Sequence, residues 1–309
     1  MAFRIPFAQA FWQEYLSGQE SKLPLLPVVS DVSKRVIRIL GGNAGSMRLQ
    51  GTNTYLVGTG KSRILIDTGQ GIPCWIQDIA QVLEDRDLEI SHVLLTHWHG
   101  DHTGGVPDLL AYNKTLCTRV YKNRPDSGQK EIRDGQVFHV EGATIRAVFT
   151  PGHAFDHMCF IMDEENALFT GDNVLGHGYS VVEDLGAYLE SLERMANLRC
   201  TIGYPAHGAK IDDLPAKMRL YIRHKEFRIQ QVFSTLEKSQ TTVAAGQVRG
   251  RGGMTLREIV QSLYGTVPPD IENALSPFLS QVLWKLAEDR RVGFEAGDPK
   301  KRRWFVSAR

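Results

Sequence analysis

The sequence is poor in cysteine, and the four cysteines it has stand far apart. Cys74, Cys117, Cys159 and Cys200 form no Cys-x-x-Cys pair anywhere in the 309 residues. Disulfide frameworks and structural zinc knuckles both need closely spaced cysteines. The scarcity of cysteine therefore argues against a disulfide framework and against a structural zinc knuckle, and it predicts a protein of a reducing compartment.

The sequence also lacks a long apolar run and a large net charge of either sign. No stretch reaches about 18 consecutive apolar residues, the length of a membrane-spanning helix, and residues 1–16 lack the apolar core of a secretion signal. The formal net charge of +1 creates no basic field that would draw the protein onto nucleic acid or membrane. With 42% hydrophobic and 23% charged residues, we expect a soluble globular protein of the cytoplasm.

What the sequence does have is a concentrated polar stretch, Thr96–His102, which reads Thr-His-Trp-His-Gly-Asp-His. It follows the apolar run Val93–Leu95, so a strand should end here and deliver the polar side chains into a loop. Imidazole and carboxylate together form the ligand set of divalent metals, zinc above all. The stretch therefore predicts a metal site at a sheet edge.

Three later strands each end in one more metal-competent side chain. His153 follows the predicted strand 144–149, Asp172 follows 167–169, and His207 follows 201–204. Taken singly, each is typical of a turn or a cap. Because strand ends converge on one rim of a sandwich, their combination with the histidine loop indicates a shared site.

The chain is expected to have three parts. Residues 1–30 form an aromatic N-terminal segment, and 31–214 alternate strands and helices in two halves, which suits an α+β sandwich of two mixed sheets with helices outside. In 215–309 a helical pattern reaches about residue 238, and the polar, glycine-rich stretch 239–253 is predicted to be a loop. Two helices and a hairpin then give a winged-helix outline.

Two local signals add detail to this plan. Gly104-Gly105 should let the chain turn tightly between the histidine loop and a helix over Val106–Tyr112. Thr255-Leu256-Arg257-Glu258 has the form of a capping box and should open a helix that reaches Tyr264.

The combined pattern resembles the metallo-β-lactamase superfamily over roughly residues 35–210. The residues that carry the resemblance are Asp67-Thr68-Gly69, His97, His99, Asp101, His102, His153, Asp172 and His207. It implies an αββα sandwich that holds two divalent metal ions, with zinc as the expectation from the ligands and manganese or iron also compatible.

The resemblance also implies a role for each residue. One metal would be held by His97, His99 and His153, the other by Asp101, His102 and His207, with Asp172 bridging and Asp67 supporting the site from outside the metal shell. Such a pair lowers the pKa of a shared water from 15.7 toward about 7, which supplies a hydroxide nucleophile. Asp101 is the candidate to orient that water and move its proton.

The remaining histidines divide into two sets. His157 stands four residues after His153, and both a leaving-group or substrate contact and a purely structural role are open for it. Ala154 departs from the commoner family pattern, which has a hydroxyl residue there. Ordinary structural or surface positions are expected for four histidines: His92, His139, His177 and His224.

Two groups of relatives within the superfamily fit more of the chain. The lactamase-like endoribonuclease of animal mitochondria is similar through Gly171–Gly176, the helix start at Glu183–Leu185 and the winged-helix tail. The atrochrysone carboxyl ACP thioesterases of fungal polyketide pathways are similar over nearly the whole length. That similarity rests on Phe11–Leu16, Leu40–Asn43, Leu49–Gly60, Thr96–Pro107 and Phe169–Gly178.

The second resemblance implies a thioesterase that releases a polyketide acyl chain from the acyl carrier protein of a non-reducing synthase. An endoribonuclease remains the alternative, and it would need a basic path to the metals. A non-enzymatic winged-helix protein that binds nucleic acid or a partner is a third hypothesis, for which Lys300–Arg303 is the best basic run. A solvated hairpin tip explains that run more simply, so we expect no nucleic acid or membrane partner, and a C-terminal region that walls the groove or mediates dimers.

Overall fold

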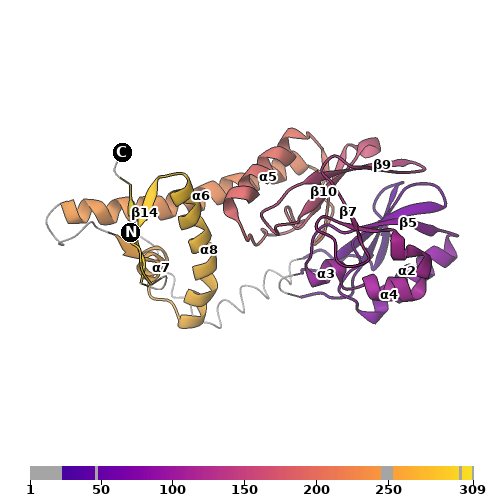
Figure 1. The fold of residues 1–309 in the computed structure, drawn as a ribbon, viewed down its shortest axis with the longest axis horizontal. Helices are drawn as coiled ribbons and strands as arrows, with labels where there is room; N and C mark the ends of the chain where they lie inside the picture. Colours follow the sequence, from indigo (N-terminus) through magenta and orange to yellow (C-terminus); the bar gives the residue numbers. More distant parts are fainter. Residues whose placement is uncertain (1–22, 46–47, 245–252, 299–300, 308–309) are drawn as a thin grey trace. The chain divides into compact units, whose positions relative to one another are not determined.

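The computed structural model describes residues 23–45, 48–244, 253–298 and 301–307. The chain divides into two compact units, with the boundary between Tyr221 and Ile222 inside a long helix, α6 (Leu214–Ala244) (Figure 1). Most of the predicted aromatic N-terminal segment lies outside the described residues. The two units are taken separately below.

The first unit contains a seven-stranded mixed sheet in which the strands follow one another in chain order. Its strands are β1 (Val29–Asp31), β2 (Val36–Leu40), β3 (Asn53–Val57), β4 (Ser62–Ile66), β5 (Glu89–Leu94), β6 (Val120–Lys122) and β7 (Lys130–Glu131). Neighbours pair antiparallel up to β4 and parallel from β4 onward. The parallel part brings the carboxyl ends of β4 and β5 to one edge of the sheet.

A five-stranded sheet packs against the first. Its order is β12-β11-β10-β9-β8, built from β8 (Val137–Val140), β9 (Ala143–Phe149), β10 (Met158–Met162), β11 (Ala167–Gly171) and β12 (Ile202–Pro205). The core between the sheets includes the rings of Tyr55, Phe169 and Tyr204, whose centroids lie 5.0–5.8 Å apart. This sheet is also mixed, because β11 and β12 run parallel.

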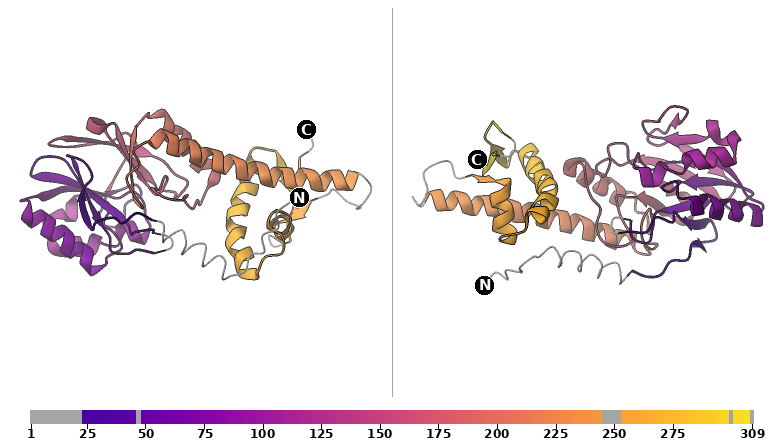
Figure 2. Two further views of the ribbon diagram at one scale, coloured as in Figure 1. Left: turned by 180° about the vertical axis from the view of Figure 1, so that it is seen from behind. Right: turned by 90° about the horizontal axis from the view of Figure 1, so that it is seen from below.

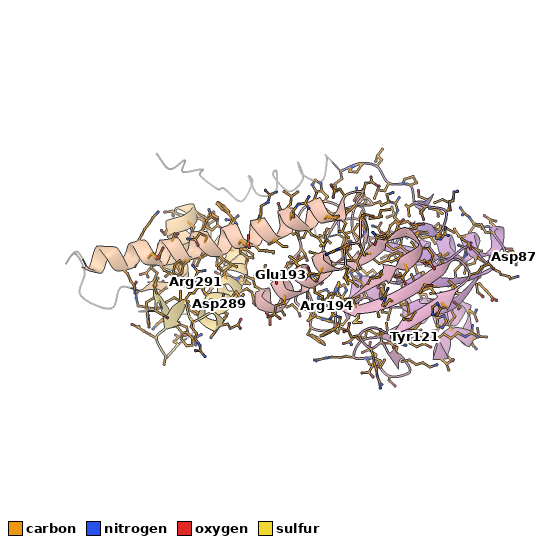
Figure 3. All side chains as sticks on the ribbon, turned by 90° about the horizontal axis from the view of Figure 1, so that it is seen from above. Asp87, Tyr121, Glu193, Arg194, Asp289 and Arg291 are labelled. Carbon is orange, nitrogen blue, oxygen red and sulfur yellow. The ribbon has the colours of Figure 1, made fainter. Side chains whose placement is uncertain are left out.

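Helices cover the outer face of each sheet (Figure 2). On the first sheet, α2 (Pro73–Asp85) and α4 (Val106–Tyr112) bury apolar side chains against outward-facing residues of β2 to β5. On the second, α5 (Leu185–Asn197) is tied down by Ser191, which donates to Pro151 O at 2.6 Å, and by Arg194, labelled in Figure 3, which pairs with Asp134 at 2.8 Å. The predicted α+β sandwich with helices outside is confirmed.

The sequence-based boundaries were wrong at a few places. Residues 239–244, predicted to be part of a loop, continue α6. The histidine loop contains a one-turn helix, α3 (Gly100–Thr103), where no helix was predicted. The short strand β7 was missed because both of its residues, Lys130 and Glu131, are exposed and give no apolar alternation. Two 3-10 turns, η1 (Lys114–Thr118) and η2 (Asp163–Glu165), complete the first unit.

The second unit carries the predicted helix–helix–hairpin arrangement with one added strand. Its sheet has the order β13-β15-β14, from β13 (Met254–Thr255), β14 (Val292–Phe294) and β15 (Arg303–Val306), and its helices are α7 (Leu256–Tyr264) and α8 (Pro269–Glu288). The capping box is present: Thr255 Oγ1 accepts from Glu258 N at 3.2 Å, and Glu258 Oε2 accepts from Thr255 N at 2.8 Å. Among the described residues, no helix is both long and apolar enough to cross a membrane.

Gly104 and Gly105 are needed for close packing rather than for an unusual backbone angle. Both have negative φ, at −65° and −83°. A Cβ on Gly105 would overlap the carbonyl oxygen of Thr68 and lie 2.6 Å from the Trp75 ring. These glycines let the chain that follows the histidine loop pass directly over the end of β4 and the first turn of α2.

We predict that Gly105→Ala lowers the free energy of unfolding by about 1–3 kcal/mol, because the added methyl group forces apart groups that are already in contact. Gly100→Ala is the matched control, since Gly100 is exposed and a Cβ there meets nothing within 4 Å. Urea unfolding followed by tryptophan fluorescence measures both. Equal stability of the two variants would contradict the packing argument.

Candidate metal centre

The ends of four strands deliver the predicted ligands to one place. The histidine loop follows β5, His153 follows β9, Asp172 follows β11 and His207 follows β12. Three groups of side chains place their ligand atoms within 4.8 Å of one another: His97, His99 and His153; His97, His102 and Asp172; and Asp101, His102 and His207. The structure thus brings all seven candidate ligands together.

The first ligand group, defined as His97, His99 and His153, brings three imidazole nitrogens into contact. His97 Nε2 lies 2.9 Å from His99 Nδ1, and His153 Nε2 lies 3.2 and 3.0 Å from the same two atoms. His153 Nδ1 donates its proton to Val181 O at 2.8 Å. The Thr96 hydroxyl donates its own proton to Asp67, so it accepts from His97 Nδ1, which lies 2.9 Å away.

These hydrogen bonds leave Nε2 of His97 and Nε2 of His153 without a proton, so two lone pairs face each other beside His99 Nδ1. Facing lone pairs repel unless a cation lies between them. Ligand nitrogens at 2.0–2.1 Å around a tetrahedral zinc ion stand about 3.3 Å apart, close to the separations of this group. The first ligand group therefore fits a divalent ion.

The second ligand group, defined as Asp101, His102 and His207, converges on one carboxylate oxygen. Asp101 Oδ2 lies 3.4 Å from His102 Nε2 and 3.3 Å from His207 Nε2. His207 Nδ1 is directed at the carbonyl oxygens of Arg48 and Gly51, at 3.1 and 3.3 Å. His102 Nε2 is buried and makes no hydrogen bond of acceptable geometry, which fits a nitrogen that ligates a metal ion.

Asp172 reaches both ligand groups. Its Oδ2 lies 3.5 Å from His153 Nε2 and 3.6 Å from His102 Nε2, and its Oδ1 lies 3.3 Å from His207 Nε2. This is the position that a carboxylate shared by two ions would occupy.

Asp67 supports the loop from beneath. Its Oδ2 accepts from His102 Nδ1 at 2.9 Å, and its Oδ1 accepts from Thr96 N at 2.8 Å. The residue is 1% exposed and adopts φ = 59°, a left-handed backbone that costs a non-glycine residue energy. A buried carboxylate that accepts from a ligand imidazole fixes its tautomer and orientation.

The electrostatics suit a cation. Burial acts to raise the pKa of Asp172 and that of Asp101, but the neighbouring His102 and His207 rings lower both, and they hold the pKa of Asp172 well below its usual range. Burial lowers the pKa of His97 and of His153. Burial also acts to lower the pKa of His207, but Asp172 and Asp101 raise it to about 9. The carboxylates are thus anionic, as metal ligands must be.

His157 is closed off from the site. It is fully buried, its Nε2 accepts from Asp172 N at 3.1 Å, and its Nδ1 lies 3.1 Å from Thr150 Oγ1. Both ring nitrogens are therefore occupied. Of the two roles that the sequence leaves open, the geometry matches the structural one, in which His157 holds the backbone of Asp172.

The structure adds an aromatic rim, defined as Trp98 and Phe155, which sequence reasoning did not single out. The two side chains are 43% and 47% exposed, and their rings are nearly parallel, 20° apart, at a centroid distance of 6.3 Å. The Trp98 ring lies 4.6 Å from the His99 ring, and the Arg124 guanidinium lies 4.8 Å from the Phe155 ring centroid. The sequence could have indicated this rim, since each of the two aromatic residues stands within two positions of a predicted ligand.

Buried charges fix this rim in place. Asp156 Oδ1 accepts from Trp98 N at 3.3 Å, and Lys122 Nζ lies 3.8 Å from Asp156 Oδ2 and 3.0 Å from Asp126. Asp156 and Lys122 are 0% and 3% exposed. The sequence gives no sign of this link, because Lys122 stands on β6, far from the histidine loop in the chain.

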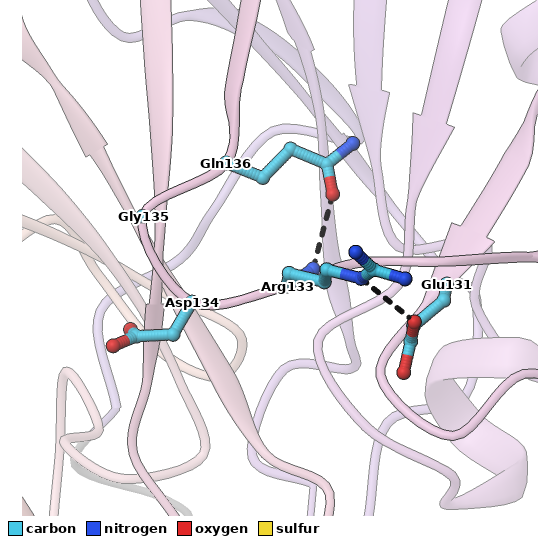
Figure 4. Close-up of a pocket in the computed structure, with 5 residues that line it drawn as sticks. All are labelled: Glu131, Arg133, Asp134, Gly135 and Gln136. Carbon is cyan, nitrogen blue, oxygen red and sulfur yellow. Dashed lines mark hydrogen bonds and ion pairs between the residues drawn. The ribbon is translucent and has the colours of Figure 1, made fainter.

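A separate surface hollow lies between β7 and β8, where Glu131, Arg133, Asp134, Gly135 and Gln136 line it (Figure 4). Its polar groups are engaged with one another: Arg133 Nε pairs with Glu131 at 3.0 Å, and Arg133 N donates to Gln136 Oε1 at 3.0 Å. It contains none of the candidate ligands.

Comparisons with known proteins identify the family of this chain. Residues 47–207 match the sequence model of the Metallo-beta-lactamase superfamily. Lactamase-like protein aptB of Emericella nidulans is 72% identical over 309 residues, covering 100% of this chain and 99% of its own. Lactamase-like protein adaB of Aspergillus niger is 70% identical, covering 99% and 96%. The chain belongs to the metallo-β-lactamase superfamily.

A solved structure shows the same fold at low identity. A beta-lactamase domain protein from Burkholderia ambifaria aligns with a TM-score of 0.74 and 17% identity, covering 93% of this chain and 98% of its own. At this identity the likeness concerns the fold alone.

We predict that Asp67→Asn weakens zinc binding by the second ligand group about 10–100-fold, the usual cost of losing a partner behind a metal ligand. Asp67 accepts from three donors on Thr96 and His102, whereas an amide offers one acceptor oxygen. Competition with a chromophoric chelator measures the affinity. Asp134→Asn, which breaks an exposed ion pair with Arg194, is the control. Unchanged affinity in Asp67→Asn would contradict the assigned role.

Proposed function

We propose that this protein is a metal-dependent thioesterase. Its substrate is the thioester between a polyketide acyl chain, of the atrochrysone carboxyl type, and the acyl carrier protein of a non-reducing polyketide synthase. Two zinc ions are the proposed cofactors, one on each ligand group, with Asp172 between them. Bound there, such ions would supply Lewis acidity and an activated water at neutral pH.

The chain's own residues then have defined tasks. The metal ions would be held by five histidines: His97, His99, His102, His153 and His207. In most of them the other ring nitrogen, Nδ1, is hydrogen-bonded to a carbonyl, hydroxyl or carboxylate oxygen, which fixes the orientation of the ring. The Asp101 side chain is 19% exposed, against 12% for Asp172, so it can accept and pass on a proton from water.

The chain's buried thiols are unsuited to act as the nucleophile. Burial raises the pKa of Cys159 to about 12 and that of Cys200 to about 11. A thiol that stays protonated at neutral pH is a poor nucleophile. Neither buried thiol is therefore a candidate nucleophile.

The enclosure of His157 is the single observation that carries the choice of a thioester. An alcohol or ribose leaving group benefits far more from a proton donor than a thiolate does, and His157, the candidate in the sequence, is fully buried with both nitrogens occupied. A pantetheine thiol has a pKa near 8.5 and leaves as a thiolate without such help, according to ordinary thiol chemistry. The endoribonuclease alternative loses its proton donor.

Two of the four residues in the basic run behind the nucleic-acid-binding alternative are engaged within the C-terminal unit. Arg303 pairs with Glu258 at 3.0 Å, and Arg302 lies 5.2 and 4.7 Å from the ring centroids of Trp284 and Phe294. Lys300 lies outside the described residues. The engaged arginines support a structural role for this turn of the C-terminal unit.

We predict that Asp101→Asn lowers kcat for hydrolysis of an acyl-pantetheine thioester by about 10²–10⁴-fold, the usual contribution of a positioned proton-transfer group. A chelator should abolish the activity, and added zinc should restore it. Release of thiol is followed with a thiol-reactive dye, with metal content measured in parallel. Asp212→Asn, whose side chain is 81% exposed, is the control. Robust RNA cleavage with no thioester hydrolysis would overturn the proposal.

The aromatic rim gives a prediction about the acyl group. A flat aromatic acyl group can stack on the near-parallel rings of Trp98 and Phe155. Such an aromatic contact contributes about 0.5–1.5 kcal/mol beyond the area it buries. We expect Trp98→Ala to lower the ratio of kcat/KM for a naphthoyl-pantetheine over a decanoyl-pantetheine by about tenfold. Tyr112→Ala, which removes another exposed ring at the end of α4, should leave the ratio unchanged. A ratio unaffected by Trp98→Ala would contradict this role.

A further inference from the structure

A chain of polar side chains leads from the surface to Asp101. Asn43 Nδ2 donates to Gln70 Oε1 at 3.2 Å and to Thr52 Oγ1 at 3.0 Å, while Thr52 N donates to Asn43 Oδ1 at 2.8 Å. Thr52 is 0% exposed and Asn43 is 7% exposed. The two side chains therefore hold each other in one arrangement.

This arrangement decides where the proton of the Thr52 hydroxyl goes. The Asn43 amide nitrogen can only donate, so Thr52 Oγ1 accepts there and keeps its own proton for another acceptor. That acceptor is Asp101 Oδ2, at 3.4 Å. The same oxygen lies 3.4 Å from His102 Nε2 and 3.3 Å from His207 Nε2, so the hydroxyl is directed at the oxygen on which the second ligand group converges.

The backbone around Thr52 also holds His207. The carbonyl oxygens of Arg48 and Gly51 accept from His207 Nδ1, and Asn53 N donates to Ala206 O at 2.6 Å. One short segment, residues 48–53, thus contacts two members of the second ligand group. Asp101 needs such an anchor, because its one-turn helix α3 leaves the side chain partly exposed.

We propose that Thr52 is a positioning residue for Asp101: its hydroxyl, oriented by Asn43, fixes the carboxylate so that the second ligand group can bind its ion. The inference rests on the two-metal site proposed above. It assigns a role to Asn43 and Thr52, which stand in the segments Leu40–Asn43 and Leu49–Gly60.

Thr54 provides a matched comparison two residues further along. It is also 0% exposed, and its hydroxyl donates to Ile39 O at 2.8 Å and accepts from Trp75 Nε1 at 2.9 Å. None of these partners belongs to either ligand group. Thr52→Val and Thr54→Val therefore remove the same hydroxyl at equal burial, and each takes one acceptor away from a buried nitrogen donor, Asn43 Nδ2 or Trp75 Nε1.

The test is a zinc titration of the full chain after it has been stripped with a chelator. Wild type, Thr52→Val, Thr52→Ser and Thr54→Val are compared by competition with a chromophoric chelator, with thermal unfolding of each metal-free form alongside. We expect Thr52→Val to bind the second zinc ion about 10–100-fold more weakly, as for other partners of metal ligands. Thr52→Ser should restore the affinity, and Thr54→Val should lower only the thermal stability.

The outcomes separate the inference from the proposal on which it rests. If wild type binds fewer than two zinc ions, the two-metal site itself is wrong. If wild type binds two and Thr52→Val binds both with wild-type affinity, the positioning role is wrong. It is also wrong if Thr54→Val weakens the second ion equally, because the loss then reflects general loosening. Should Thr52→Val fail to fold, Asn43→Ala tests the same step, and unchanged second-ion affinity in it overturns the inference.

Discussion

The rest of the structure serves one arrangement, in which unprotonated imidazole nitrogens of neighbouring histidines face one another. His97 and His153 each direct an Nε2 lone pair toward the other, 3.2 Å apart, because their Nδ1 protons are committed to Thr96 and to Val181 O. Such an arrangement is unfavourable in a protein without a cation and favourable around one. The two ionised carboxylates beside it, Asp101 and Asp172, add the negative charge that a divalent ion needs.

The fold supplies the fixed partners that hold these nitrogens in place. The parallel β4 and β5 put Asp67 beneath the histidine loop, where it accepts from Thr96 and His102. The close contact between Gly105 and the end of β4 brings the chain back over the same point. Ligands from four strands therefore meet with their orientation already set, which is the condition for a preorganised catalytic site.

Sequence reasoning could go far here because strong local signals coincide with the tertiary plan. Helix α4 has the predicted bounds, since two glycines precede its apolar pattern. The seven candidate ligands could be named because the histidine loop and three later side chains follow apolar strands in a pattern that resembles the superfamily. The enclosure of His157 and the Lys122–Asp156 link were not, because they depend on which segments pack together. The prediction of a loop at residues 239–244 was wrong because a polar stretch can continue a helix as readily as form a loop.

The proposed function rests on the contrast between a set of candidate metal ligands suited to activating water and the enclosure of His157, which leaves that ring with no free nitrogen. That contrast favours a leaving group that departs unaided, and the aromatic rim offers a flat surface beside the ligands for the acyl group. The most direct test of the central claim is anomalous diffraction at the zinc edge from crystals of the zinc-loaded protein. The account predicts two peaks, one among His97, His99 and His153 and the other among Asp101, His102 and His207. No peak within these two groups would contradict it.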